Sequence, residues 1–153
     1  MAARTVMRTP VGAGTVRQGS TANVGALVLT QKAAIVYSVA TAQTICIVPA
    51  GSQILEIYID VTTAFNDSGT DLLDIGDGTT ADLFLSAVSI APTGRIIGSS
   101  DAGGSGGMIG WQNLGSGTAD VTIKATYTGQ NANASTGAAT ITVIYAVPMS
   151  TWN

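Results

Sequence analysis

The chain of 153 residues contains no histidine and only one cysteine, Cys46. Without histidine it lacks the commonest general base and metal ligand, and a single thiol can form neither an intrachain disulfide nor a zinc site of several cysteines. We therefore expect no catalytic residues, no metal and no cofactor, and we do not expect an enzyme. Cys46 lies in the apolar run TICIVP, where we expect a small buried side chain.

Charge is also scarce, because only 10% of the residues are charged, whereas 46% are hydrophobic and 5% aromatic. A surface with so few charges tends to associate, which hints at an assembly. No apolar run is long enough to span a membrane, and residues 1–12 lack the pattern of a signal peptide. We expect synthesis in a cytoplasm and no membrane partner.

What the chain has in abundance is Thr, Val and Ile, which favour strands over helices. Short apolar runs begin at residue 24, with 24–30 and 33–40 as the first two, and recur at near-regular spacing, giving about eight or nine strands. The clearest alternation lies in residues 53–65, and residues 121–127 and 140–147 alternate as well; 131–137 is typical of a hairpin tip between these two. A weak helical turn is possible near residues 70–74. Within residues 53–65, four side chains are predicted to face the core: Leu55, Ile57, Ile59 and Val61. The pattern predicts an all-β antiparallel sandwich or barrel over residues 24–148.

Charge is distributed unevenly along the chain. The first 55 residues contain four basic and no acidic residues, whereas the remainder contains two basic and nine acidic ones. Residues 1–23 show no strand or helix period, so we predict an extended basic arm. Arg4, Arg8 and Arg17 could meet an acidic protein surface or simply remain solvated. Nucleic acid is not an expected partner, because dense Lys/Arg runs and interleaved aromatics are missing.

Acidic residues crowd the stretch after residue 65, where Asp67, Asp71, Asp74, Asp77 and Asp82 follow one another. They could bind calcium or supply an acid–base pair, or they could form turns by accepting hydrogen bonds from their own backbone. Residues 71, 74 and 77 are three apart, which is not the spacing of an EF-hand. We favour turn-forming residues on an exposed connection.

The two tryptophans and the final strand supply candidate contact residues. Trp111 follows a glycine-rich stretch and is expected in the core or in a subunit interface. Ile144 lies on the second, partly apolar face of the last strand, which is expected to be central or covered by another subunit. Trp152, in a tail of residues 149–153, could anchor in a pocket of a partner. Either tryptophan could alternatively be a carbohydrate platform.

Three stretches resemble a known family: DVTTAFNDSGTDLLDIGDGTTADLFLSA, the pair GR at 94–95, and ATYTGQNANASTGAATITVIYAV. They are similar to head decoration, cement or head-fibre proteins of tailed bacteriophages, over residues 52–147. The resemblance implies a jelly-roll β-sandwich that forms a homotrimer on the outside of the capsid, bound to the major capsid protein.

The leading hypothesis is therefore a structural virion protein, made in the host cytoplasm, that cements neighbouring capsid subunits. Its expected capsid contacts are Arg4, Arg8, Arg17 and Trp152. The alternative is a tail or head fibre module that binds a glycan or receptor on the host surface, with a site formed by Trp111 and the loops 99–107 and 129–137.

Overall fold

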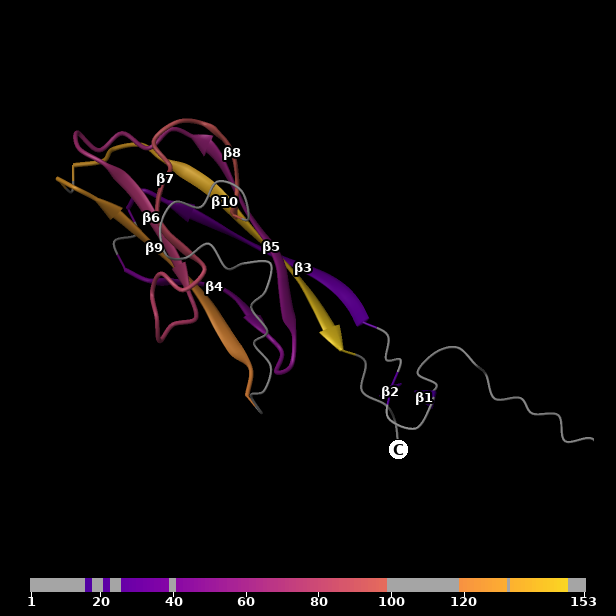
Figure 1. Ribbon diagram of the computed structural model, residues 1–153. Coiled ribbons are helices and arrows are strands. Elements are labelled where there is room, and N and C mark those ends of the chain that lie inside the picture. The colour runs from indigo at the N-terminus through magenta and orange to yellow at the C-terminus, as the bar shows by residue number, and fades with distance from the viewer. Residues whose placement is uncertain are drawn as a thin grey trace, which may run out of the picture.

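The computed structural model (Figure 1) describes residues 16–17, 21–22, 26–38, 41–98, 119–131 and 133–148. Two short strands, β1 (Val16–Arg17) and β2 (Thr21–Ala22), pair with each other. Eight further strands form the body of the protein: β3 (Ala26–Val36), β4 (Gln43–Val48), β5 (Gln53–Thr63), β6 (Asp71–Gly76), β7 (Leu85–Ser89), β8 (Gly94–Ile97), β9 (Val121–Gly129) and β10 (Ala138–Pro148). Among the described residues, no helix is long and apolar enough to span a membrane.

These eight strands form two antiparallel sheets of four, stacked face to face. One sheet has the order β3-β10-β5-β8 and the other the order β4-β9-β6-β7. The first strand of the sandwich pairs with the last, and the chain crosses repeatedly from one sheet to the other. This is the strand order of a jelly roll, in which two Greek keys fold over one core. The predicted all-β, jelly-roll-like sandwich is confirmed.

The core lies between the sheets and is formed by the alternating positions that the sequence indicates. In β9, Ile123, Ala125 and Tyr127 are buried, and in β10 the buried residues are Ile141, Val143 and Tyr145. Branched and aromatic side chains on one face of each strand leave water together, which is the main driving force for folding. The alternation predicted for these two strands is confirmed.

The prediction for Leu55 is wrong. Leu55 is 38% exposed, whereas the preceding Ile54 is fully buried together with Ile57 and Ile59. The register against β10 shifts here, since Ile144 pairs with Glu56 and Tyr145 with Ile54. A β-bulge sets two residues opposite one, so the alternation changes face at Leu55.

Other boundaries differ from the predicted ones as well. The runs 24–30 and 33–40, predicted as separate strands, are joined in the single strand β3, which pairs with β10 without interruption over 11 residues. Residues 71–76 form β6, so the helical turn considered near residues 70–74 is wrong. Residues 131–137 connect β9 to β10, but these strands lie in different sheets and do not pair, so the segment is a crossover between the sheets and the predicted hairpin tip is wrong.

Cys46 is buried in the core, as predicted, with 4% of its surface exposed. Burial disfavours the charged thiolate and raises the pKa of its thiol to about 11. The side chain therefore contributes packing as a neutral thiol.

Candidate functional site

Two loops meet at one end of the sandwich, residues 64–70 between β5 and β6 and residues 130–137 between β9 and β10. We call this region the loop end. Asp67 joins the two loops: its Oδ1 accepts hydrogen bonds from the backbone amides of Gly69 (2.9 Å) and Asn131 (3.0 Å), and its Oδ2 accepts one from Asn133 (3.1 Å). Only 7% of Asp67 is exposed. A buried carboxylate held by several amides is a strong local constraint, because such charge-assisted bonds exceed neutral ones in strength.

Neighbouring side chains extend this connection between the loops. Asn66 accepts hydrogen bonds through its Oδ1 from the backbone amides of Ser135 (2.8 Å) and Thr136 (2.9 Å). In return, Asn133 accepts one through its Oδ1 from the backbone amide of Ser68 (2.9 Å). Loops leave many backbone groups without strand partners, and here the side chains of each loop serve the backbone of the other.

Beneath the loops, the first residue of β6 accepts a bond from the core. The hydroxyl of Tyr127 donates to Oδ1 of Asp71 over 2.5 Å, and the backbone amide of Asp67 donates to the same oxygen. Burial, followed by the hydrogen bond to Asp71, raises the pKa of Tyr127 above its ordinary value. The phenol therefore stays a donor, and its ring packs 5.0 Å from the ring centroid of Phe65.

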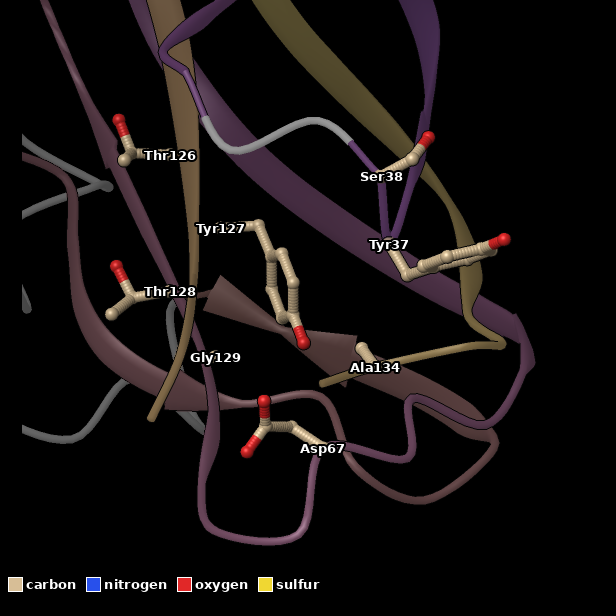
Figure 2. Close-up of a pocket in the computed structure, with 8 residues that line it drawn as sticks. All are labelled: Tyr37, Ser38, Asp67, Thr126, Tyr127, Thr128, Gly129 and Ala134. Carbon is tan, nitrogen blue, oxygen red and sulfur yellow. The ribbon is translucent and has the colours of Figure 1, made fainter. Parts of the chain in front are cut away.

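A cavity of about 390 Å³ opens beside this cluster (Figure 2). It exists because β4 begins at Gln43, opposite Ala125, whereas β9 continues to Gly129. In Figure 2 the Tyr127 hydroxyl points toward the wall of the cavity where Asp67 lies, and the Tyr37 ring lies on the opposite wall. Eight residues line the cavity: Tyr37, Ser38, Asp67, Thr126, Tyr127, Thr128, Gly129 and Ala134. Hydroxyl groups and aromatic rings suit a small polar ligand, but both carboxylate oxygens of Asp67 already accept backbone amides.

Asp77 follows the predicted role of a turn former, because it accepts hydrogen bonds from the backbone amides of Thr79 and Thr80. Asp74 does not, because it lies within β6 and accepts a hydrogen bond from the backbone amide of Ala87 on the neighbouring strand β7. Placing Asp67 and Asp71 on an exposed connection was wrong, because both are buried. In the part of the chain that the structure describes, no three His, Cys, Asp or Glu side chains gather to hold a metal ion.

One ion pair marks the outer face of the first sheet. Asp60 on β5 accepts from Arg95 on β8 through both carboxylate oxygens, at 2.6 Å and 2.9 Å. The hydrogen bond from Arg95 lowers the pKa of Asp60. The guanidinium also lies 5.2 Å from the ring centroid of Tyr58, within the range of a cation–π contact.

Most of the contact residues predicted from sequence lie beyond what the structure describes. Arg4, Arg8, Trp111 and Trp152 are outside the described residues, and Arg17 is described only as backbone of β1. Ile144 is partly buried on the central strand β10, on the outer face of its sheet. Its role in a subunit interface stays a prediction.

Two features were missed by sequence reasoning. The cluster of Asp67, Asp71 and Tyr127 joins residues some 60 positions apart, and no local pattern indicates such pairing. The second feature is the exposed apolar start of β3, where Leu27 is 55% and Val28 57% exposed. The continuous run ALVL, apolar on both faces of a strand, was a signal for it.

No protein-family model matches this chain, and no curated protein matches it significantly in sequence. Solved structures do share its fold. A chain of the cyanophage Pam1 capsid asymmetric unit is 18% identical, with a TM-score of 0.56 over 95% of this chain and 100% of that one. A chain of the acidic stable capsid structure of Helicobacter pylori bacteriophage KHP30 is 16% identical, with a TM-score of 0.54 over 84% of this chain and 99% of that one. The jelly-roll architecture is thus shared with chains found in two phage capsids.

Proposed function

We propose that this chain is a structural protein of a phage virion that binds the outside of the icosahedral head and cements neighbouring capsid subunits. The observation that carries the proposal is the shared fold: this chain covers the full length of one capsid chain and 99% of the other. The neighbours are therefore chains built on the same single sandwich, rather than larger proteins that contain it as one part. The local resemblance of residues 52–147 to head decoration proteins supports the same role.

The proposed mechanism is adhesion without catalysis or cofactor. The sandwich of residues 24–148 would rest on the major capsid protein as a homotrimer, while the arm of residues 1–23 and the tail of residues 149–153 reach neighbouring subunits. Arg4, Arg8 and Arg17 would meet acidic patches of the capsid, and Trp152 would fill a pocket. Many copies of a modest contact give a large total stabilisation of a closed shell.

The proposal is tested by mixing the purified protein with phage heads that lack it and measuring occupancy after sedimentation. Saturable binding is expected, with heads that then resist heat or chelation better than bare heads. Changing Arg4, Arg8 and Arg17 together to Ala is expected to lower occupancy, and the difference between wild type and variant is expected to shrink as salt is raised.

The matched control changes Lys32, Arg95 and Lys124 to Ala, which removes the same three charges from the sandwich instead of the arm. This variant is expected to bind heads more tightly than the arm variant. Equal occupancy of wild type and arm variant would contradict the role of the arm, and absence of binding to heads would contradict the cement function itself.

The alternative, a fibre module that recognises a host glycan, has one described feature in its favour. The cavity at the loop end adjoins the loop of residues 130–137 and is lined by the rings of Tyr37 and Tyr127. Sugar rings stack on aromatic faces, and their hydroxyls pair with polar groups. Saturable binding of the protein to a glycan array, lost in Tyr37→Ala, together with no binding to heads, would favour this module over the cement protein.

A further inference from the structure

The first half of β3 forms an unfinished edge of the sandwich. Residues 26–30 are all exposed, and they include Leu27 (55%), Val28 (57%) and Leu29 (36%). From Gln31 onward β3 contacts the other sheet, because Gln31 donates to the carbonyl of Ile47 on β4 (2.9 Å). Gln31 also donates to the hydroxyl of Tyr145 on the neighbouring strand β10 (2.6 Å). In Figure 1 the start of β3 and the end of β10 project together past the other strands.

The other three edges of the sandwich are protected against pairing with another chain. β8 has only four residues and carries Arg95, and β7 has five, with a register shift against β6 and a positive φ of 50° at Ala87. β4 has six residues and a register shift between Thr44 and Cys46. Short length, charge and bulges are the devices by which proteins prevent strand addition at sheet edges.

β3 has none of these devices along its start. It pairs with β10 over 11 residues without a register shift, and among the described strands β10 is its sole pairing partner. Its first five residues, ALVLT, carry no charge and no proline. A long, regular, apolar edge is the kind that another strand adds to.

We propose that this edge is an interface with a second copy of the chain, in which the two β3 strands pair antiparallel across a twofold axis close to Val28. The described edges of the sandwich favour this occupant, since β3 is the unprotected one among them and can therefore pair best with another β3. Such a contact is closed: it uses the free edge of both copies and cannot continue into a fibre.

The residues of the strand suit pairing with themselves. With Val28 on the axis, Leu27 of one copy faces Leu29 of the other, so apolar side chains oppose apolar ones, and no charge lies within residues 26–30. Lys32 lies four residues from the axis and would face residue 24 of the other copy, so the two lysines do not meet. This inference is independent of the capsid function, because it concerns contact between copies alone.

The test is analytical ultracentrifugation of the purified full-length protein. The wild type is expected as a dimer of the 15.3 kDa chain or, if the chain also trimerises, as a pair of trimers. Val28→Lys sets two lysines opposite each other across the axis, so it is expected to halve the mass of the particle and to weaken association on the order of tenfold or more. Circular dichroism checks that the variant remains folded.

Leu55→Lys is the matched control, because Leu55 is also an exposed apolar strand residue (38%) but lies on β5, away from the edge. It adds the same charge and is expected to leave the mass unchanged. A wild type that is a single chain or a single trimer would overturn the proposal and assign the edge to the N-terminal segment or to a capsid strand. An unchanged mass of Val28→Lys would overturn it as well.

A cross-link gives a second, independent measurement. Facing residues of an antiparallel pair lie about 4.5–5.5 Å apart at Cα, a distance that a disulfide spans. Since the native Cys46 is buried, Val28→Cys adds a single exposed thiol, and mild oxidation is expected to give a covalent dimer on a denaturing gel. Leu55→Cys is expected to stay monomeric there. Equal amounts of dimer from the two variants, or none from Val28→Cys, would contradict pairing through β3.

Discussion

The loop end and the start of β3 differ in whether their polar and apolar groups find partners within the chain. At the loop end, Asp67 and Asn66 accept hydrogen bonds from backbone amides that have no strand partner, so the chain completes itself there. At the start of β3, Leu27 and Val28 remain exposed, and one side of the strand has no described partner. The first region is polar and internally satisfied, and the second is apolar and unfinished.

The comparison separates stability from association. A buried polar network contributes much less to the stability of the folded chain when one member is removed, because the remaining groups are left buried without partners. An exposed apolar edge contributes little to the stability of the isolated chain. It contributes to the free energy of association, because its apolar surface leaves water when another strand covers it. Changes at the loop end should therefore weaken folding, whereas changes at the start of β3 should weaken assembly.

The largest effect on folding is expected from Asp67→Ala. The substitution removes a buried carboxylate and leaves the amides of Gly69, Asn131 and Asn133 without their acceptor in a partly buried site. Loss of several charge-assisted hydrogen bonds is costly even where water replaces some of them, and we expect a loss of about 2–4 kcal/mol in the free energy of unfolding. Chemical denaturation monitored by circular dichroism measures it.

Asp82→Ala is the control for this prediction, since Asp82 is exposed and its one described contact is a 3.4 Å bond from the Ser86 hydroxyl. It is expected to change stability by less than about 0.5 kcal/mol. A similar cost for both variants would mean that loss of a turn aspartate, rather than of the buried network, sets the effect.

This contrast also marks what the sequence could predict. The alternation in residues 121–127 and 141–147 could be predicted from local chemistry. In β9 and β10 every second residue faces the core, and most of these residues are branched or aromatic. Leu55 shows the limit: whether a strand bulges depends on its partner β10, which is 80 or more residues away in the chain. An alternating pattern cannot report that shift.

The candidate site was less predictable than the fold for the same physical reason. The acidic run indicated turns, and Asp77 behaves as predicted, but burial of Asp67 depends on the loop of residues 130–137 folding over it. The spacing of residues along the chain does not predict that a loop so far away in the sequence covers Asp67. The predicted contacts at Arg4 and Trp152 lie outside the described residues and stay predictions.

A smaller effect is expected from Tyr127→Phe at the same loop end. The substitution removes the hydroxyl that donates to Asp71 but keeps the ring that packs on Phe65. Asp71 keeps its bond from the amide of Asp67, so we expect a loss of about 1–2 kcal/mol. Denaturation measures the loss, and Tyr58→Phe, at a partly buried tyrosine of β5, is the control. Loss of association without loss of stability would contradict the separation between the two regions.

The smallest effect is expected at β8, the far edge of the sheet that β3 begins. Arg95 holds the pKa of Asp60 below its ordinary value, so the ion pair favours the folded state above the unfolded pKa of about 3.9. That contribution is lost as pH falls through the lower folded pKa. Because both groups face solvent, it is also screened by salt.

Arg95→Gln is expected to return the pKa of Asp60 toward its ordinary value, as measured by NMR titration of the Asp60 carboxyl carbon. Lys32→Gln is the control and should shift it far less, because Lys32 acts on Asp60 only through a weaker charge interaction. Neither change should alter the mass of the particle if copies of the chain associate through the β3 edge and not through the β8 edge. An unchanged titration in Arg95→Gln would mean that the pair does not form in solution. A reduced particle mass would mean that β8, too, takes part in assembly, and the distinction between the two edges of this sheet would then fail.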